Sequence, residues 1–141
     1  HSIRRRQRQM CIRDRRNGML LRTVLQDSKS NGKKNYVYGA STKGNTMLQF
    51  WKLHDLFEGA AEIHPDKVGR YTVGTGIPIV HEDDAKKDAD LFFVPNFGFK
   101  DMFVEKESEW LEQGGRMLFA MPDVNVVEHK GKNGTKDSIR D

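Results

Sequence analysis

Apolar and polar positions alternate in blocks along the chain, and the first blocks predict a helix, a strand and a second helix. Apolar residues within 21–28 recur at helical spacing, and the polar run SNGKK at 30–34 ends that helix with a turn. The β-branched and aromatic run 36–38 predicts a strand. Polar residues follow from Gly39, and helical spacing returns over 42–55. This order indicates a strand, a tight glycine turn and a helix.

The second half of the chain repeats the alternation of strands and helices. In chain order we expect a strand at 60–63, a loop with an extended exit at 64–80, a polar helix at 82–88, a strand at 90–95, a helix at 100–113 and a strand at 116–121. The strand at 90–95 has the continuous apolar run that is typical of strands buried on both faces. The alternation predicts an α/β fold, a small three-layer Rossmann-like parallel sheet with the strand at 36–38 in its centre.

The charge is divided between an N-terminal arm and the rest of the chain. The 141 residues carry a formal charge of +4, but residues 1–22 hold eight arginines and one aspartate, or +7, which leaves −3 elsewhere. The arm lacks interleaved aromatic residues, so it does not have the pattern of a nucleic-acid binder. We expect a disordered basic arm at 1–16, a domain at 17–127 and a polar tail at 128–141. The run 6–16, RQRQMCIRDRR, resembles translated sequencing-adapter read-through.

Cysteine use and the lack of long apolar runs limit the class of protein. The single cysteine, Cys11, lies in the arm, so the body has neither a disulfide nor a thiolate metal site. No apolar run is long enough to span a bilayer, and no signal peptide is seen. We therefore expect a cytoplasmic location and no membrane partner. The acidic cluster after His81 has the pattern of an exposed turn and helix cap rather than a metal site.

The glycine turn has three chemical interpretations. GASTKGNT at 39–46 matches the phosphate-binding pattern G-x-x-x-x-G-K-[ST] except that Asn45 stands in place of the lysine, which argues against an NTPase. GAS also opens many short-chain dehydrogenases, but the chain has no Tyr-x-x-x-Lys pair. A nucleotide-binding turn is the third interpretation. Its backbone amides would face an anionic or hydroxyl-rich ligand, and Glu62, about twenty residues further on, would accept from ribose hydroxyls.

Two loops that follow successive strands supply the candidate ligand-binding residues. If both open at the carboxyl edge of a parallel sheet, cations and a helix start meet there and suit a diphosphate. For Lys67 and Arg70, an ordinary solvated turn is the alternative, and for Glu62 a solvated strand end. The expected substrate-binding residues are Gly39, Ser41, Lys43, Asn45, Glu62, Lys67, Arg70 and Tyr71. No catalytic residue and no metal ligand is expected.

Several segments together carry a resemblance to a known family. YGASTKGNTMLQF, HPDKVGRYTVGTGIPI, a strand that ends at Pro95, and EKESEWLEQGGRMLFAMP follow one another at the family's spacing. They resemble the C-terminal domain of the sugar C-methyltransferases, S-adenosylmethionine-dependent enzymes that act on nucleotide-linked deoxysugars. The resemblance covers about residues 17–127. Val73 and Asn96 depart from it, because the family usually has Pro and Trp there.

The resemblance implies that this chain is part of a larger enzyme. Family members carry a cysteine-rich zinc-binding domain, a middle domain for the methyl donor, and a Rossmann-like C-terminal domain beside the sugar nucleotide. Neither of the first two occurs in these residues. We therefore expect a fragment that is inactive alone and binds no S-adenosylmethionine, with a nucleotide-linked sugar and the missing domains as partners. The alternative is a free-standing nucleotide-binding or interaction module without catalysis.

Overall fold

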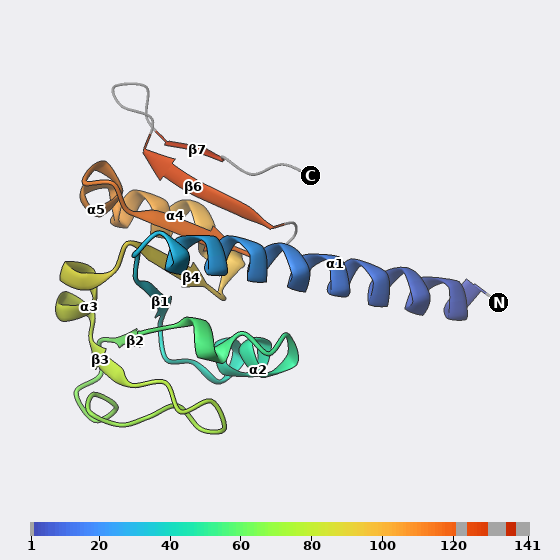
Figure 1. Cartoon of the computed structure of the whole chain (residues 1–141), viewed down its shortest axis with the longest axis horizontal. Coiled ribbons are helices and arrows are strands. Elements are labelled where there is room, and N and C mark those ends of the chain that lie inside the picture. The colour runs from blue at the N-terminus through green and yellow to red at the C-terminus, as the bar shows by residue number, and fades with distance from the viewer. Residues whose placement is uncertain (1, 121–123, 130–134, 138–141) are drawn as a thin grey trace.

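The computed structural model describes residues 2–120, 124–129 and 135–137, and its centre is a seven-stranded sheet (Figure 1). The strands are β1 (Asn35–Tyr38), β2 (Gly59–Glu62), β3 (Ile79–His81), β4 (Leu91–Val94), β5 (Arg116–Phe119), β6 (Asn125–His129) and β7 (Thr135–Asp137). Their order is β3-β2-β1-β4-β5-β6-β7, in which β1 to β5 are parallel and β6 and β7 are antiparallel additions at one edge. Strand β1, which we expected in the centre, lies inside the sheet between β2 and β4, and β4 is the middle strand of the seven.

Helices cover both faces of the sheet, so the predicted three-layer α/β arrangement is confirmed (Figure 1). They are α1 (Ser2–Ser30), α2 (Thr42–Phe50), α3 (Glu82–Asp88), α4 (Lys100–Lys106) and α5 (Ser108–Glu112), with 3-10 turns η1 (His54–Leu56) and η2 (Phe97–Phe99). One core layer joins α1 and α2 to Phe93 of β4, and the other joins α3 and α5 to Phe92. Successive side chains of a strand point to opposite faces, which explains why β4 is apolar throughout.

The N-terminal arm differs from the expectation of disorder at residues 1–16. Helix α1 begins at Ser2 and runs unbroken into the domain, and its N-terminal half extends beyond the sheet (Figure 1). Arginine and glutamine, which dominate this stretch, are good helix formers. The contact with the body begins within the expected arm, because the Trp51 indole Nε1 donates to the Asp14 carbonyl at 2.9 Å. Gly18 lies against the same ring, where a Cβ would come within 2.5 Å of it.

The C-terminal end also differs from the expected loose tail at 128–141. Residues 128 and 129 belong to β6, which pairs antiparallel with β5, and β7 pairs with β6 in turn. Val126 and Val127 are buried against the two core layers. Their apolar run is short and lies among polar residues, so the sequence pattern alone does not predict this strand. The strand stabilises the sheet edge. The sheet is therefore mixed rather than wholly parallel.

Two predicted helices are shorter than expected. The helix expected over 42–55 ends at Phe50, because Lys52 takes a left-handed conformation (φ 54°) before η1. The helix expected over 100–113 is divided into α4 and α5 at Glu107, which is only 4% exposed. The buried Glu107 carboxylate contacts Tyr38 and Lys86, which belong to the candidate site described below.

Candidate functional site

The predicted strand, glycine turn and helix are confirmed at the carboxyl end of β1. Gly39 has φ 94°, a conformation that glycine adopts without the steric penalty of a Cβ. Ser41 caps α2, and its Oγ accepts from the Gly44 amide at 3.1 Å. Gly44 lies so close to the end of β4 that a Cβ there would come within 2.6 Å of Pro95. The turn therefore places the start of α2 directly over the carboxyl edge of the sheet.

Asn45, one of the predicted binding residues, binds the protein itself. The Asn45 Nδ2 donates to the Val73 carbonyl at 2.5 Å, and its Oδ1 accepts from the Thr75 hydroxyl. These bonds fasten the loop before β3 to α2. Lys43 lies on the exposed surface of the first turn of the same helix. The loop therefore lies beside the helix start, and the Asn45 amide is a structural contact.

Glu62 also has a different position from the expected ribose contact. Its Oε2 accepts from the Ala40 amide at 3.2 Å, and its Oε1 accepts from the His64 amide at 3.2 Å. The carboxylate thus bridges the turn after β1 and the turn after β2. The Ala40 amide, which we expected to face a ligand, therefore donates to Glu62 instead.

The structure separates the second group of predicted residues. Lys67 lies in the turn that starts at His64, so it stays near the carboxyl end of β2. The chain then folds back as a hairpin, in which the Ile79 amide donates to the Arg70 carbonyl at 2.8 Å and Tyr71 bridges Pro78. Two strands stand between Arg70 and β1, a separation of about 14 Å at the usual strand spacing. Arg70 and Tyr71 therefore pair along the sheet edge beside β3, whereas the residues that follow, 72–75, return to the glycine turn and the start of α2.

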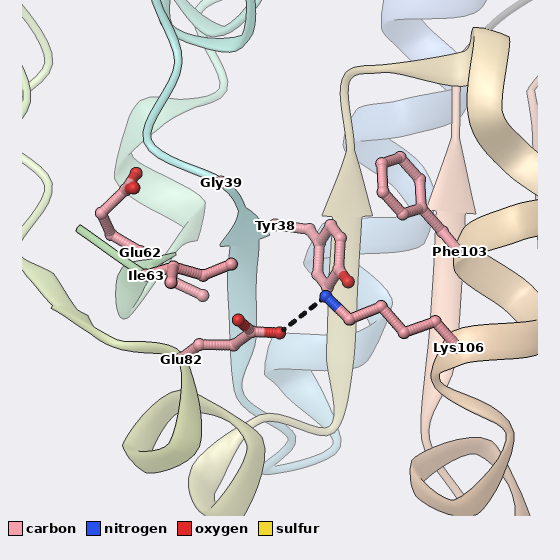
Figure 2. A pocket seen from close by; sticks show the side chains of 8 residues that line it. Tyr38, Gly39, Glu62, Ile63, Glu82, Phe103 and Lys106 are labelled. Atoms are coloured by element: carbon pink, nitrogen blue, oxygen red, sulfur yellow. Dashed lines mark ion pairs between the residues drawn. The ribbon is translucent and has the colours of Figure 1, made fainter.

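A cavity that the sequence analysis did not anticipate lies at the ends of β1 and β2. Its volume is about 150 Å³, and residues of α3 and α4 line its other sides, although it stays open to solvent. The lining side chains are Tyr38, Ala61, Glu62, Ile63, Glu82, Phe103 and Lys106, with the Gly39 backbone (Figure 2). The side chains of Tyr38, Glu82 and Lys106 converge in this view. Four elements that are distant in sequence therefore build one site at the carboxyl edge.

A chain of charged contacts runs behind the cavity. The Glu82 Oε1 lies 2.9 Å from the Lys86 Nζ and 3.6 Å from the Lys106 Nζ. Lys86 also lies 2.9 Å from the Glu107 Oε1, and the Tyr38 hydroxyl donates to the Glu107 Oε2 at 2.5 Å. The carboxylates are well shielded, with side-chain exposures of 13% for Glu82 and 5% for Glu107. The network fixes the ring of Tyr38 and the carboxylate of Glu82 in the cavity wall.

The environment sets the protonation states of this network. Burial raises the pKa of Tyr38, and the hydrogen bond to Glu107 raises it further. Burial also raises the pKa of Glu82, but Lys86 and Lys106 outweigh burial, so the net pKa lies below the ordinary value of 4.5. At neutral pH Tyr38 is therefore a neutral donor and Glu82 is a carboxylate. The cavity offers fixed acceptors, one ammonium group and apolar walls.

The sequence patterns around Glu82 predicted structural roles and not a place in a cavity wall. Glu82 and Lys86 form an i, i+4 pair, which is usually a surface feature. The cluster at 81–84 was predicted to be a turn and helix cap, and His81 does cap α3, since its Nδ1 accepts from the Asp83 amide at 3.1 Å. Only the packing of α3 and α4 around β1 shows that Glu82 faces a cavity. Within the described part of the chain, no three His, Cys, Asp or Glu side chains gather as metal ligands do.

A mainly parallel sheet covered on both faces, with a glycine turn and a cavity at its carboxyl edge, defines a Rossmann-like domain. The sequence matches the C-methyltransferase C-terminal domain family over residues 9–122, and the chain belongs to that family. The resemblance drawn from the motifs is thereby confirmed. The match begins inside the expected N-terminal arm, as does the contact of α1 with Trp51.

The chain is also similar to a curated protein, C-methyltransferase NovU of Streptomyces niveus. The two are 27% identical over 109 residues, which is 76% of this chain and 26% of that protein. The chain therefore spans about a quarter of the length of this relative. Among the described residues, the helices are either too short or too polar to cross a bilayer.

Proposed function

We propose that this domain forms the sugar-nucleotide side of the cleft in an S-adenosylmethionine-dependent C-methyltransferase, and that the chain is a part of that enzyme. Family membership and the similarity to a C-methyltransferase support the enzyme class. The observation that carries the proposal is the carboxyl edge of the sheet, where the glycine turn, the start of α2 and the cavity meet. Ligands of open α/β sheets bind at this edge.

The start of α2 is the part of this edge that suits a diphosphate. Amides at a helix start carry a partial positive charge, and an anion there is stabilised. Lys43, on the first turn of α2, adds a full positive charge on the exposed surface. A nucleotide diphosphate would thus lie along the turn, with Lys43 as its charged contact.

We propose that S-adenosylmethionine does not bind in the cavity beside Tyr38. A cavity of about 150 Å³ is smaller than the 300 to 1,000 Å³ of sites that enclose ligands of this size. Glu62, the acidic residue in the position that binds ribose in nucleotide-binding folds, holds two backbone amides instead. We therefore assign the methyl donor to another domain of the parent enzyme, and methyl transfer requires that domain.

Calorimetric titration with thymidine-diphosphate glucose tests the proposal. Lys43→Ala should weaken binding by about ten-fold, since a charge-assisted hydrogen bond contributes about 1.5 to 3 kcal/mol. Lys33→Ala is the matched control, because Lys33 is exposed in the turn before β1, at the opposite edge of the sheet. Arg70→Ala reports on the edge hairpin.

The outcomes separate the proposal from its alternatives. Loss of affinity in Lys43→Ala with no change in Lys33→Ala supports binding at the glycine turn. Loss in Arg70→Ala alone would move the ligand to the edge hairpin. The absence of measurable binding would contradict the proposed role and favour a domain that acts through protein contacts.

A further inference from the structure

We propose that the cavity beside Tyr38 is a subsite for a neutral, hydroxylated six-membered ring, the pyranose of the sugar nucleotide, and that it excludes the phosphates. This inference rests on the proposed function and deepens it, because it divides one ligand between two places on the carboxyl edge. The observations that carry it are the size of the cavity, its walls and its charges.

The size of the cavity matches one ring. A cavity of about 150 Å³ lined by apolar side chains is known to hold benzene, a six-membered ring. The cavity beside Tyr38 has a similar volume, about 150 Å³, but it is open to solvent at the ends of β1 and β2 and has charged side chains in its wall, so substituents of a ring can extend from it. A nucleotide is too large for this space. One ring therefore enters while the remainder of the ligand stays outside, towards α2.

The walls suit a ring that has both apolar faces and hydroxyl groups. Tyr38 and Phe103 meet edge to face with their centroids 5.2 Å apart, and the chain of contacts through Glu107 holds the tyrosine in place. Ile63, at 61% exposure, stands at the mouth (Figure 2). These surfaces are available to the C–H groups of a pyranose, and a deoxysugar offers more such surface than a fully hydroxylated one.

Glu82 and Lys106 supply the polar contacts. Their closest atoms are 3.6 Å apart, longer than a hydrogen bond, and Lys106 is 49% exposed (Figure 2). A sugar hydroxyl between them would donate to the Glu82 carboxylate and accept from the Lys106 ammonium. Because Lys86 holds the same carboxylate from behind at 2.9 Å, Glu82 keeps its position while Lys106 adjusts.

The charges disfavour a phosphate in this cavity. Glu62 and Glu82 line it and Glu107 lies behind, against the ammonium groups of Lys86 and Lys106. The local balance is one net negative charge, and the carboxylates of Glu82 and Glu107 are better shielded than the Lys106 ammonium group. A like charge near a shielded carboxylate is unfavourable. The diphosphate is therefore kept near the start of α2 while the neutral ring enters.

Titration of the chain with two ligands, followed by amide and methyl NMR shifts, tests the division. Thymidine diphosphate and thymidine-diphosphate glucose should both shift amides at 40–44, and only the glucose compound should shift the Ile63 methyl groups and the Lys106 amide. Lys106→Met should weaken the glucose compound about ten-fold, or about 1.4 kcal/mol, and change thymidine diphosphate less than two-fold. Ile63→Ser is a second variant, because its exposed side chain is not needed for folding. Lys87→Met, an exposed charge change on α3, is the matched control.

Each result decides between the two proposals. Equal shifts of Ile63 with both ligands, or unchanged affinity for the glucose compound in Lys106→Met and Ile63→Ser, would overturn the ring subsite and leave the proposed function intact. Failure of both ligands to bind the wild-type chain would overturn the proposed function and the subsite together. An equal effect of Lys87→Met would show a general charge effect and would also overturn the subsite.

Discussion

Replacement of Asn35 by alanine tests how α1 is joined to the sheet. Asn35 is 1% exposed at the start of β1. Its Oδ1 accepts from the Ser28 hydroxyl at 2.7 Å, and its Nδ2 donates to the carbonyls of Leu25 at 3.0 Å and Leu56 at 3.1 Å. One side chain thus connects α1, β1 and η1. The alanine variant loses all three bonds and leaves the Ser28 hydroxyl buried without this acceptor.

The expected loss follows from these contacts. At about 1 kcal/mol for each buried hydrogen bond, Asn35→Ala should lower the free energy of unfolding by about 3 kcal/mol. For a chain of this size that corresponds to a fall in Tm of about 10 °C. Urea and thermal unfolding followed by circular dichroism measure both quantities. Asn31→Ala, on the exposed turn between α1 and β1, is the control and should change stability by less than about 0.5 kcal/mol.

A double-mutant cycle shows whether the energy comes from the predicted contact. Ser28→Ala removes one of the three bonds, so its coupling to Asn35→Ala should be about 1 kcal/mol. A loss below about 1 kcal/mol in Asn35→Ala, or a coupling near zero, would show that these hydrogen bonds do not join α1 to the sheet. In that case α1 would be attached to the sheet by apolar packing alone.

Three further changes probe the turn, the cavity and the long helix. Gly44→Ala should cost about 1 to 3 kcal/mol in urea unfolding, because its Cβ would meet Pro95 at 2.6 Å. Lys86 and Lys106 hold the pKa of Glu82 in the folded state below 4.5, so the wild type loses this stabilisation as the pH falls below about 4.5. In Glu82→Gln the free energy of unfolding should therefore decrease less steeply with falling pH in this range. An unchanged pH dependence would contradict the network. Deletion of residues 1–16 removes the carbonyl that Trp51 binds, and the Tm should fall by a few degrees; an unchanged value would mean that this bond adds nothing.

Local patterns were sufficient to predict the interior of the fold. The strand expected at 36–38, the helix expected at 82–88 and the apolar strand at 90–95 all occur in the structure, with boundaries that agree to about a residue. Each of these elements can be predicted from its own residues alone. The continuous apolar run of β4, for example, is typical of a strand that is covered on both faces. The glycine turn and its serine cap follow from the same local chemistry.

The remaining features depend on contacts that sequence spacing does not show. The loop before β3 was expected to open at the carboxyl edge. Its residues 72–75 do contact the start of α2, but its first part folds back along β3 and places Arg70 and Tyr71 at the sheet edge. Glu107 was read as part of one continuous helix, yet its burial against Tyr38 coincides with the break between α4 and α5. The cavity arises from side chains of four elements, so no single motif encodes it.

The most direct test of the proposed sugar-nucleotide role is saturation-transfer NMR on this chain with thymidine-diphosphate glucose. Saturation of the protein methyl groups passes to the ligand protons that lie closest to the protein. We expect strong transfer to the glucose ring protons, because that ring enters the cavity beside Tyr38, and weaker transfer to the thymine methyl group. Transfer confined to the thymidine protons would contradict the ring subsite, and no transfer to any ligand proton would contradict the sugar-nucleotide role itself.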